Sequence, residues 1–156
     1  MKKVLTLVLL TLVLTASSLA AQLGSLLDIE GIGPATVDKL TRAGVGTPQA
    51  LLDAGATKKG RAELSQKTGI STSQLLKWVN RVDLSRVKGI GPQYADLLEA
   101  AGVDTPKELA SRNPDHLVET LTRTNNERHL VRQVPSASQV GTWITSAKKL
   151  KPIVQY

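Results

Sequence analysis

The sequence predicts an all-α protein built from two copies of one helical unit. Residues 31–34 and 89–92 both read Gly-Ile-Gly-Pro, and the similarity continues at the same offset of 58 residues through the sequence that follows. Such self-similarity at a fixed period indicates that one supersecondary unit occurs twice. Strand patterns are nearly absent, because the chain has no Phe and no sustained alternation of β-branched residues. Apolar residues recur instead at helical spacing.

The first 21 residues are predicted to be a secretory signal peptide. Lys2 and Lys3 precede an apolar stretch over residues 4–14, and small residues around Ala20 suit cleavage. Because this stretch is shorter than the roughly 20 apolar residues that cross a bilayer, an uncleaved anchor is the less favoured alternative. The absence of Cys excludes disulfides and lipid attachment to a thiol. We therefore expect a periplasmic or secreted product with no membrane span after cleavage.

The first copy, residues 22–83, is predicted to contain four helices bounded by capping residues, Pro and Gly. These helices are expected at residues 34–43, 48–52, 59–67 and 72–82. Thr47 and Ser71 are the candidate N-caps, and Gln74 stands where a capping box requires it.

The second copy, residues 84–150, follows the same order. Its helices are expected at residues 92–101, 106–111, 115–122, 126–133 and 136–149. Trp78 and Trp143 match at an offset of 65 residues, which indicates an insertion of seven residues in the second copy. We place this insertion near Asn113 and Pro114 or at a polar turn over residues 124–126. Residues 151–156 are either an ordered or a frayed tail.

The two Gly-Ile-Gly-Pro phrases, here called the first hairpin (residues 31–34) and the second hairpin (residues 89–92), have a physical role. A turn of a few residues between helices needs backbone freedom that Gly supplies, and the Ile fills the space beneath it. Pro then fixes the first turn of the next helix. The free amides at that helix start, together with the helix dipole, form a potential phosphate site.

Residues 27–34 and 85–92 resemble helix-hairpin-helix motifs, and each copy resembles the paired hairpin module of DNA repair and recombination proteins. Residues 69–71 and 134–136 stand where that module has a second, degenerate hairpin. Residues 26–156 as a whole resemble an uncharacterised bacterial family of tandem helix-hairpin-helix proteins, one of the domain-of-unknown-function families, and residues 51–57 and 77–81 are typical of it. The resemblance implies two tandem helix-hairpin-helix modules of short helices.

The resemblance also implies that backbone amides at both hairpins contact DNA phosphates. In the first copy the candidate residues are Gly31, Gly33, Ala35 and Thr36, and in the second copy they are Gly89, Gly91, Gln93 and Tyr94. Hairpin carbonyls are candidate ligands for a monovalent cation; these belong to Leu27, Ile29 and Ile32, and to Ser85, Val87 and Ile90. No other cofactor and no metal is expected.

The charges near the two hairpins differ. Asp28 and Glu30 flank the first hairpin, whereas Arg86 and Lys88 flank the second. The second hairpin is therefore the better candidate phosphate site, with Arg86 and Lys88 as contributors. The alternative for either hairpin is that its glycines serve the turn alone.

Patterns typical of enzymes are lacking. His116 with Glu119 and His129 with Glu127 are the only histidine-carboxylate neighbours, and neither forms a recognisable metal or catalytic spacing. We therefore expect a non-enzymatic protein. The two Trp residues are interpreted as core anchors rather than base-stacking residues, and the basic cluster at residues 58–61 as a solvated loop.

Two functions remain open. The net charge of +7 is spread along the chain, so it permits an anionic partner without requiring one. In the first function, the hairpins bind backbone phosphates of duplex DNA outside the cytoplasm without reading its sequence. In the second, the protein is a structural or protein-protein interaction module of the cell envelope with no nucleic-acid role.

Overall fold

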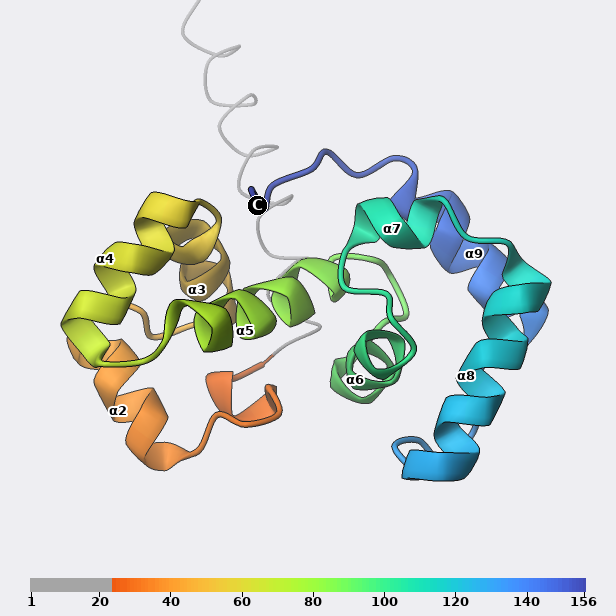
Figure 1. The fold of residues 1–156 in the computed structure, drawn as a ribbon, viewed down its shortest axis with the longest axis horizontal. Helices are drawn as coiled ribbons and strands as arrows, with labels where there is room; N and C mark the ends of the chain where they lie inside the picture. The colour runs from red at the N-terminus through yellow and green to blue at the C-terminus, as the bar shows by residue number, and fades with distance from the viewer. Residues whose placement is uncertain (1–23) are drawn as a thin grey trace, which may run out of the picture.

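The computed structural model describes residues 24–156, so the predicted signal peptide lies outside the described residues. This part contains eight α-helices, one 3-10 helix and no strand, which confirms the all-α prediction (Figure 1). The elements are η1 (Leu26–Asp28), α2 (Pro34–Arg42), α3 (Pro48–Gly55), α4 (Lys58–Thr68), α5 (Thr72–Leu84), α6 (Pro92–Ala100), α7 (Pro106–Ala110), α8 (Pro114–Arg128) and α9 (Ala137–Ala147). Over residues 24–156, no helix has both the length and the apolar character that a membrane crossing requires.

Side-chain caps explain where most helices begin. Thr47 accepts a hydrogen bond from the amide of Ala50 at 3.1 Å, as predicted for the start of α3. Ser71 caps α5 through the amide of Gln74 at 3.2 Å, which supplies one of the two bonds of a capping box. Gly69 ends α4 in the left-handed conformation, with φ at 72°.

The helix predicted at residues 115–122 continues to Arg128 in one helix, α8, and the second helix predicted at residues 126–133 is wrong, because residues 129–133 are not helical. Asn125 does not form a turn, because its side chain instead anchors the loop after the helix. Its Oδ1 accepts from the Val131 amide at 2.9 Å, and its Nδ2 donates to the Val131 carbonyl at 3.0 Å. The helix ends at His129, whose φ is 53°. The inserted residues therefore lie in α8, which has 15 residues against 11 in α4, and in the longer loop that follows it.

The hydrophobic core consists of two clusters that meet along α5. The first cluster surrounds Trp78 and extends along α5 to Val82, and the second begins at Leu84 and surrounds Trp143. Both Trp side chains are buried, which confirms their prediction as core anchors. The division into modules at residues 22–83 and 84–150 stays a prediction.

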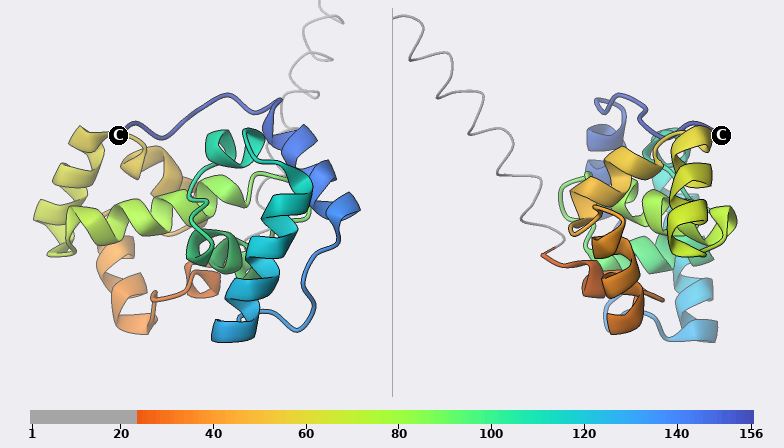
Figure 2. Two further views of the ribbon diagram at one scale, coloured as in Figure 1. Left: turned by 45° about the vertical axis from the view of Figure 1, so that its right-hand side comes forward. Right: turned by 90° about the vertical axis from the view of Figure 1, so that its left-hand side faces the viewer.

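The tail is ordered in this structure and crosses from one copy to the other. It leaves the end of α9, passes over α5 and ends beside α3 and α4 (Figure 1). Its closing contact is a hydrogen bond of 2.8 Å from the Gln155 amide to the Ala56 carbonyl. In Figures 1 and 2 the tail lies along the opposite edge of the molecule from η1, the start of α2 and α6.

Candidate phosphate-binding hairpins

The two hairpins have nearly the same backbone. The first glycine of each phrase has a positive φ, 85° at Gly31 and 93° at Gly89. The second glycine of each is an extended helix N-cap, with φ at −94° for Gly33 and −86° for Gly91. Before the first turn lies η1, which spans three residues, and before the second turn lies the irregular segment of residues 85–88 that follows α5. The repeated phrase therefore forms the same turn twice, each time leading directly into a helix.

The intervening Ile fills the space beneath each turn. Ile32 and Ile90 are buried, and their amides donate to the carbonyls of Ile29 and Val87, both at 3.0 Å. The carbonyls of Ile29 and Val87 were predicted as candidate ligands for a monovalent cation. Each of them already accepts the hydrogen bond that closes its turn.

The first glycine of each hairpin is required by the fold. A Cβ at Gly31 would lie 3.4 Å from the indole Nε1 of Trp78, and a Cβ at Gly89 would lie 2.9 Å from the Nε1 of Trp143. The Trp78 indole also donates to the Glu30 carbonyl at 3.1 Å. Positive φ and close packing against an indole therefore account for Gly31 and Gly89 without any ligand.

The second glycine of each hairpin has no such explanation. A Cβ at Gly33 or Gly91 would meet nothing within 4 Å, and both residues have a backbone conformation that any residue can adopt. Neither helix start has a side-chain cap. The backbone therefore remains open to a close approach from outside at these two positions.

Most of the candidate amides at the hairpins are free. Within residues 24–156, no acceptor bonds the amides of Gly33 and Ala35 in the first copy, or those of Gly91, Gln93 and Tyr94 in the second. Thr36 differs from the prediction, because its amide donates to the Gly33 carbonyl at 2.9 Å in a tight first turn. The second hairpin therefore presents one more free amide than the first.

The side chain of Tyr94 points into the protein, although its amide is free. The hydroxyl donates to the Gln133 carbonyl at 3.3 Å, and the ring lies 5.0 Å from that of Trp143 between centroids. Any contribution of Tyr94 to a phosphate site would therefore come from its backbone.

Arg86 is not arranged as the sequence predicted. Its Nη1 pairs with Asp83 Oδ1 at 2.6 Å, and its Nη1 and Nη2 donate to the Lys151 carbonyl at 3.3 and 3.2 Å. Burial raises the pKa of Asp83, while the bond and charge of Arg86 oppose that shift. Of the two predicted cations at the second hairpin, only Lys88 is exposed.

Sequence reasoning missed the role of Arg81, which joins the two hairpin regions. Its Nη1 donates to the Glu30 carbonyl beside the first hairpin at 2.8 Å. Its Nε and Nη2 pair with Asp96 Oδ1 at 2.8 Å and Glu99 Oε2 at 2.6 Å, both on α6 behind the second hairpin. We call Arg81, Glu30, Asp96 and Glu99 the Arg81 node. Arg81 thus offsets part of the negative charge that Asp96 and Glu99 place near the second hairpin.

The Arg81 node lines a polar cleft between the first hairpin and α6, together with Gln93, Arg128 and His129. Burial raises the pKa of Asp96 to about 6, which outweighs the lowering by Arg81, and Glu30 and Glu99 raise it further. The folded protein therefore binds a proton at Asp96 in a pH range where the unfolded chain does not.

We expect this proton to make the protein more stable as the pH falls from 7 to 5. Because the folded pKa of Asp96 lies above its unfolded value, stability is gained below the folded pKa and lost as the pH rises through it. The gain should be about 1 kcal/mol relative to Asp96→Asn, a variant in which this proton is absent. Urea unfolding of both proteins at several pH values measures the difference, and parallel pH profiles would contradict the expectation.

Both His residues lie on α8 or at its end, and both are exposed. Among residues 24–156, no group of three or more His, Asp or Glu side chains is placed to hold a metal ion.

Comparison with known proteins gives one match. The model of a family described as Domain of unknown function (DUF4332) matches residues 30–150. No curated protein and no solved structure matches the chain.

Proposed function

This chain belongs to the family Domain of unknown function (DUF4332), and we propose that it is an exported, non-enzymatic protein that binds backbone phosphates of duplex DNA without reading the sequence. In this proposal the two copies are tandem helix-hairpin-helix modules. The amides of Gly33 and Ala35, and those of Gly91, Gln93 and Tyr94, would donate to phosphate oxygens at the starts of α2 and α6.

The observation that carries the proposal is the open space at Gly33 and Gly91. Glycine loses more backbone entropy on folding than other residues, and at an N-cap it lacks the side-chain hydrogen bond that Ser, Asp or Asn would supply, so it stabilises the fold little where neither φ nor packing requires it. Both positions lie at the start of a helix with free amides and no side-chain cap. Close approach of an external acceptor explains glycine at both positions, whereas the internal packing does not.

The charges favour the second hairpin as the stronger of the two. Lys88 is exposed beside it, and Arg81 already pairs with the nearby Asp96 and Glu99. At the first hairpin, Asp28 accepts the Ser25 amide at 2.8 Å, and no Lys or Arg within residues 24–156 pairs with it. Lys39 is exposed on the helix that follows and supplies a cation there.

We expect the purified protein to bind duplex DNA of any sequence, with an affinity that falls as salt is raised. Contacts with two or three phosphates correspond to a slope of about −2 to −3 in a plot of the logarithm of the association constant against the logarithm of the salt concentration. Lys88→Glu and Gly91→Val should each weaken binding about fivefold to tenfold while the circular dichroism spectrum is unchanged. Fluorescence anisotropy with a labelled duplex measures both effects.

Lys59→Glu is the matched charge reversal for Lys88→Glu, because Lys59 is also exposed, forms only a surface pair with Glu63 at 3.9 Å, and lies on α4, away from both hairpins. It should cost much less affinity than Lys88→Glu. Absence of binding at low salt, or equal losses for the two lysines, would overturn the proposal.

A protein-protein interaction role in the cell envelope is the second candidate function. Gly31 and Gly89 favour this function over DNA binding. Packing against Trp78 and Trp143 explains these two of the four hairpin glycines without a bound phosphate. This function predicts no DNA binding at low salt together with reproducible crosslinking to one protein in the envelope fraction. Cell fractionation tests export separately, since recovery of the intact, uncleaved chain from the cytoplasm would contradict it.

A further inference from the structure

Backbone hydrogen bonds attach the end of the tail to the first copy. The Gln155 amide donates to the Ala56 carbonyl at 2.8 Å, and the Gln155 carbonyl accepts from Nη2 of Arg61 at 2.7 Å. Arg61 is 4% exposed and also donates to the carbonyls of Gly55 and Ala56, so contacts within the first copy also hold its guanidinium. The end of the tail therefore docks at the connection between α3 and α4.

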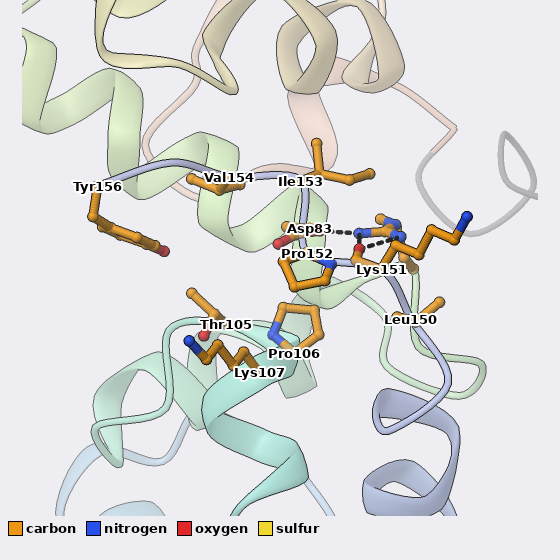
Figure 3. A pocket seen from close by; sticks show the side chains of 11 residues that line it. Asp83, Thr105, Pro106, Lys107, Leu150, Lys151, Pro152, Ile153, Val154 and Tyr156 are labelled. Carbon is orange, nitrogen blue, oxygen red and sulfur yellow. Dashed lines mark hydrogen bonds and ion pairs between the residues drawn. The ribbon is translucent and has the colours of Figure 1, made fainter.

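Side chains of the tail complete the docking. Ile153 and Val154 pack against the hydrophobic cluster of the first copy, and the hydroxyl of Tyr156 donates to Asn80 Oδ1 at 2.8 Å. Figure 3 shows Ile153, Val154 and Tyr156 lying over α5 and above Thr105 and Pro106 of the second copy. The tail and the second copy line a hollow of about 140 Å³ here. The tail thus contacts one copy while its covalent attachment is to the other.

The near end of the tail is held as well. Arg86 binds the Lys151 carbonyl and pairs with Asp83 at the end of α5 (Figure 3). An arginine predicted to bind phosphate therefore anchors the tail where it leaves α9.

The two copies are connected on opposite sides of α5. The Arg81 node connects them at the cleft beside the first hairpin and α6, and the tail connects them along the opposite edge (Figures 1 and 2). Between the copies, the chain passes through the short irregular segment of residues 85–88. Val87 of this segment is buried in the second core, so a rotation of one copy against the other would disturb this packing and would also break the Arg81 node or the contacts of the tail.

We propose that the tail is a strap that fixes the relative position of the two hairpins. If the hairpins bind DNA as proposed above, the strap also sets the distance between the two phosphates that the hairpins bind at the same time. This consequence rests on the proposed function. Two linked sites bind one ligand tightly only when their geometry permits both contacts together.

The absence of Cys allows a direct measurement, because Cys can be introduced at exposed Gln66 on α4 and exposed Arg123 on α8 and then spin-labelled. Distances between the labels are compared in the otherwise unchanged chain, in a chain that lacks residues 151–156, and in an Ile153→Ala, Val154→Ala, Tyr156→Phe variant. We expect a single narrow distribution in the first and a broader one with longer distances in the other two. Lys151→Ala is the matched control, because it retains the carbonyl that Arg86 binds and should leave the distribution narrow.

Circular dichroism shows whether the shortened chain folds. If it does not fold, the triple variant still tests the strap. An unchanged distribution in the folded variants would overturn the strap. DNA affinity is measured in the same proteins, and we expect it to fall about tenfold with loss of the strap. A broadened distribution in proteins that never bind DNA would support the strap and contradict the proposed function, so the two failures are distinguishable.

Discussion

Replacing Arg81 by Ala should lower the free energy of unfolding by about 2–4 kcal/mol. The guanidinium pairs with Asp96 and Glu99, whose side chains are only 18% and 21% exposed, and its own side chain is 16% exposed. Its removal leaves two poorly solvated carboxylates facing each other and takes a donor from the Glu30 carbonyl. Urea unfolding followed by circular dichroism measures the loss.

Lys77→Ala is the matched control for Arg81→Ala. Lys77 also pairs with Glu99, but at 3.9 Å and with 62% of its side chain exposed, so its loss should cost less than about 0.5 kcal/mol. Arg81→Met combined with Asp96→Asn and Glu99→Gln should recover much of the lost stability, because it removes the buried charges together. Equal costs for Arg81→Ala and Lys77→Ala would show that the node does not act as an ion pair in a poorly solvated site.

Helix α5 contributes side chains to both copies and to the contact between them. The helix supplies Trp78 to the first core, Leu84 to the second core and Arg81 to the contact between the hairpin regions. The fold therefore depends on this single helix for both packing and orientation. Under the strap proposal, the tail adds a second connection between the copies on the other side of α5.

Features set by neighbouring residues could be predicted from the sequence. Thr47 and Ser71 cap helices because their hydroxyls reach amides three residues further along the chain. The matching positions of Trp78 and Trp143 on apolar helix faces predicted their burial. The repeated phrase predicted one turn formed twice, since Gly and Pro act on their own backbone.

Features set by distant partners could not be predicted in this way. Arg61 was assigned to a solvated loop at residues 58–61, but α4 begins at Lys58 and Arg61 is buried with a tail partner 94 residues away. Arg86 and Arg81 likewise bind carbonyls 65 and 51 residues away. A basic residue on a helix or turn carries no local indication of such a partner, so each resembled a surface charge. The polar residues 124–126 were predicted to form a turn, but they lie within α8. The side chain of Asn125 bonds the backbone of Val131 in the loop after the helix, and the sequence does not indicate this contact.

Replacing Gly89 by Ala should lower the free energy of unfolding by about 2–4 kcal/mol. A side chain is disfavoured at a φ of 93°, and the new Cβ would lie 2.9 Å from Nε1 of Trp143 in the second core. Gly31→Ala should cost less, about 1–2 kcal/mol, because the corresponding distance to Trp78 is 3.4 Å. Urea unfolding gives both values, and Trp fluorescence reports on the two cores.

Gly91→Ala tests the separate role of the second glycine in the same hairpin. Its Cβ meets nothing within 4 Å, so stability should change by less than about 1 kcal/mol, the usual effect of Ala at a helix N-cap. Under the proposed function, the same methyl group stands where a phosphate approaches, and DNA affinity should fall. The two glycines of this hairpin therefore have different expected roles, one in folding and one in binding. Gly89→Ala should destabilise the protein, whereas Gly91→Ala should weaken DNA binding in a protein that remains folded. A Gly91→Ala protein with full DNA affinity, or a Gly89→Ala protein with full stability, would show that this division of roles is wrong.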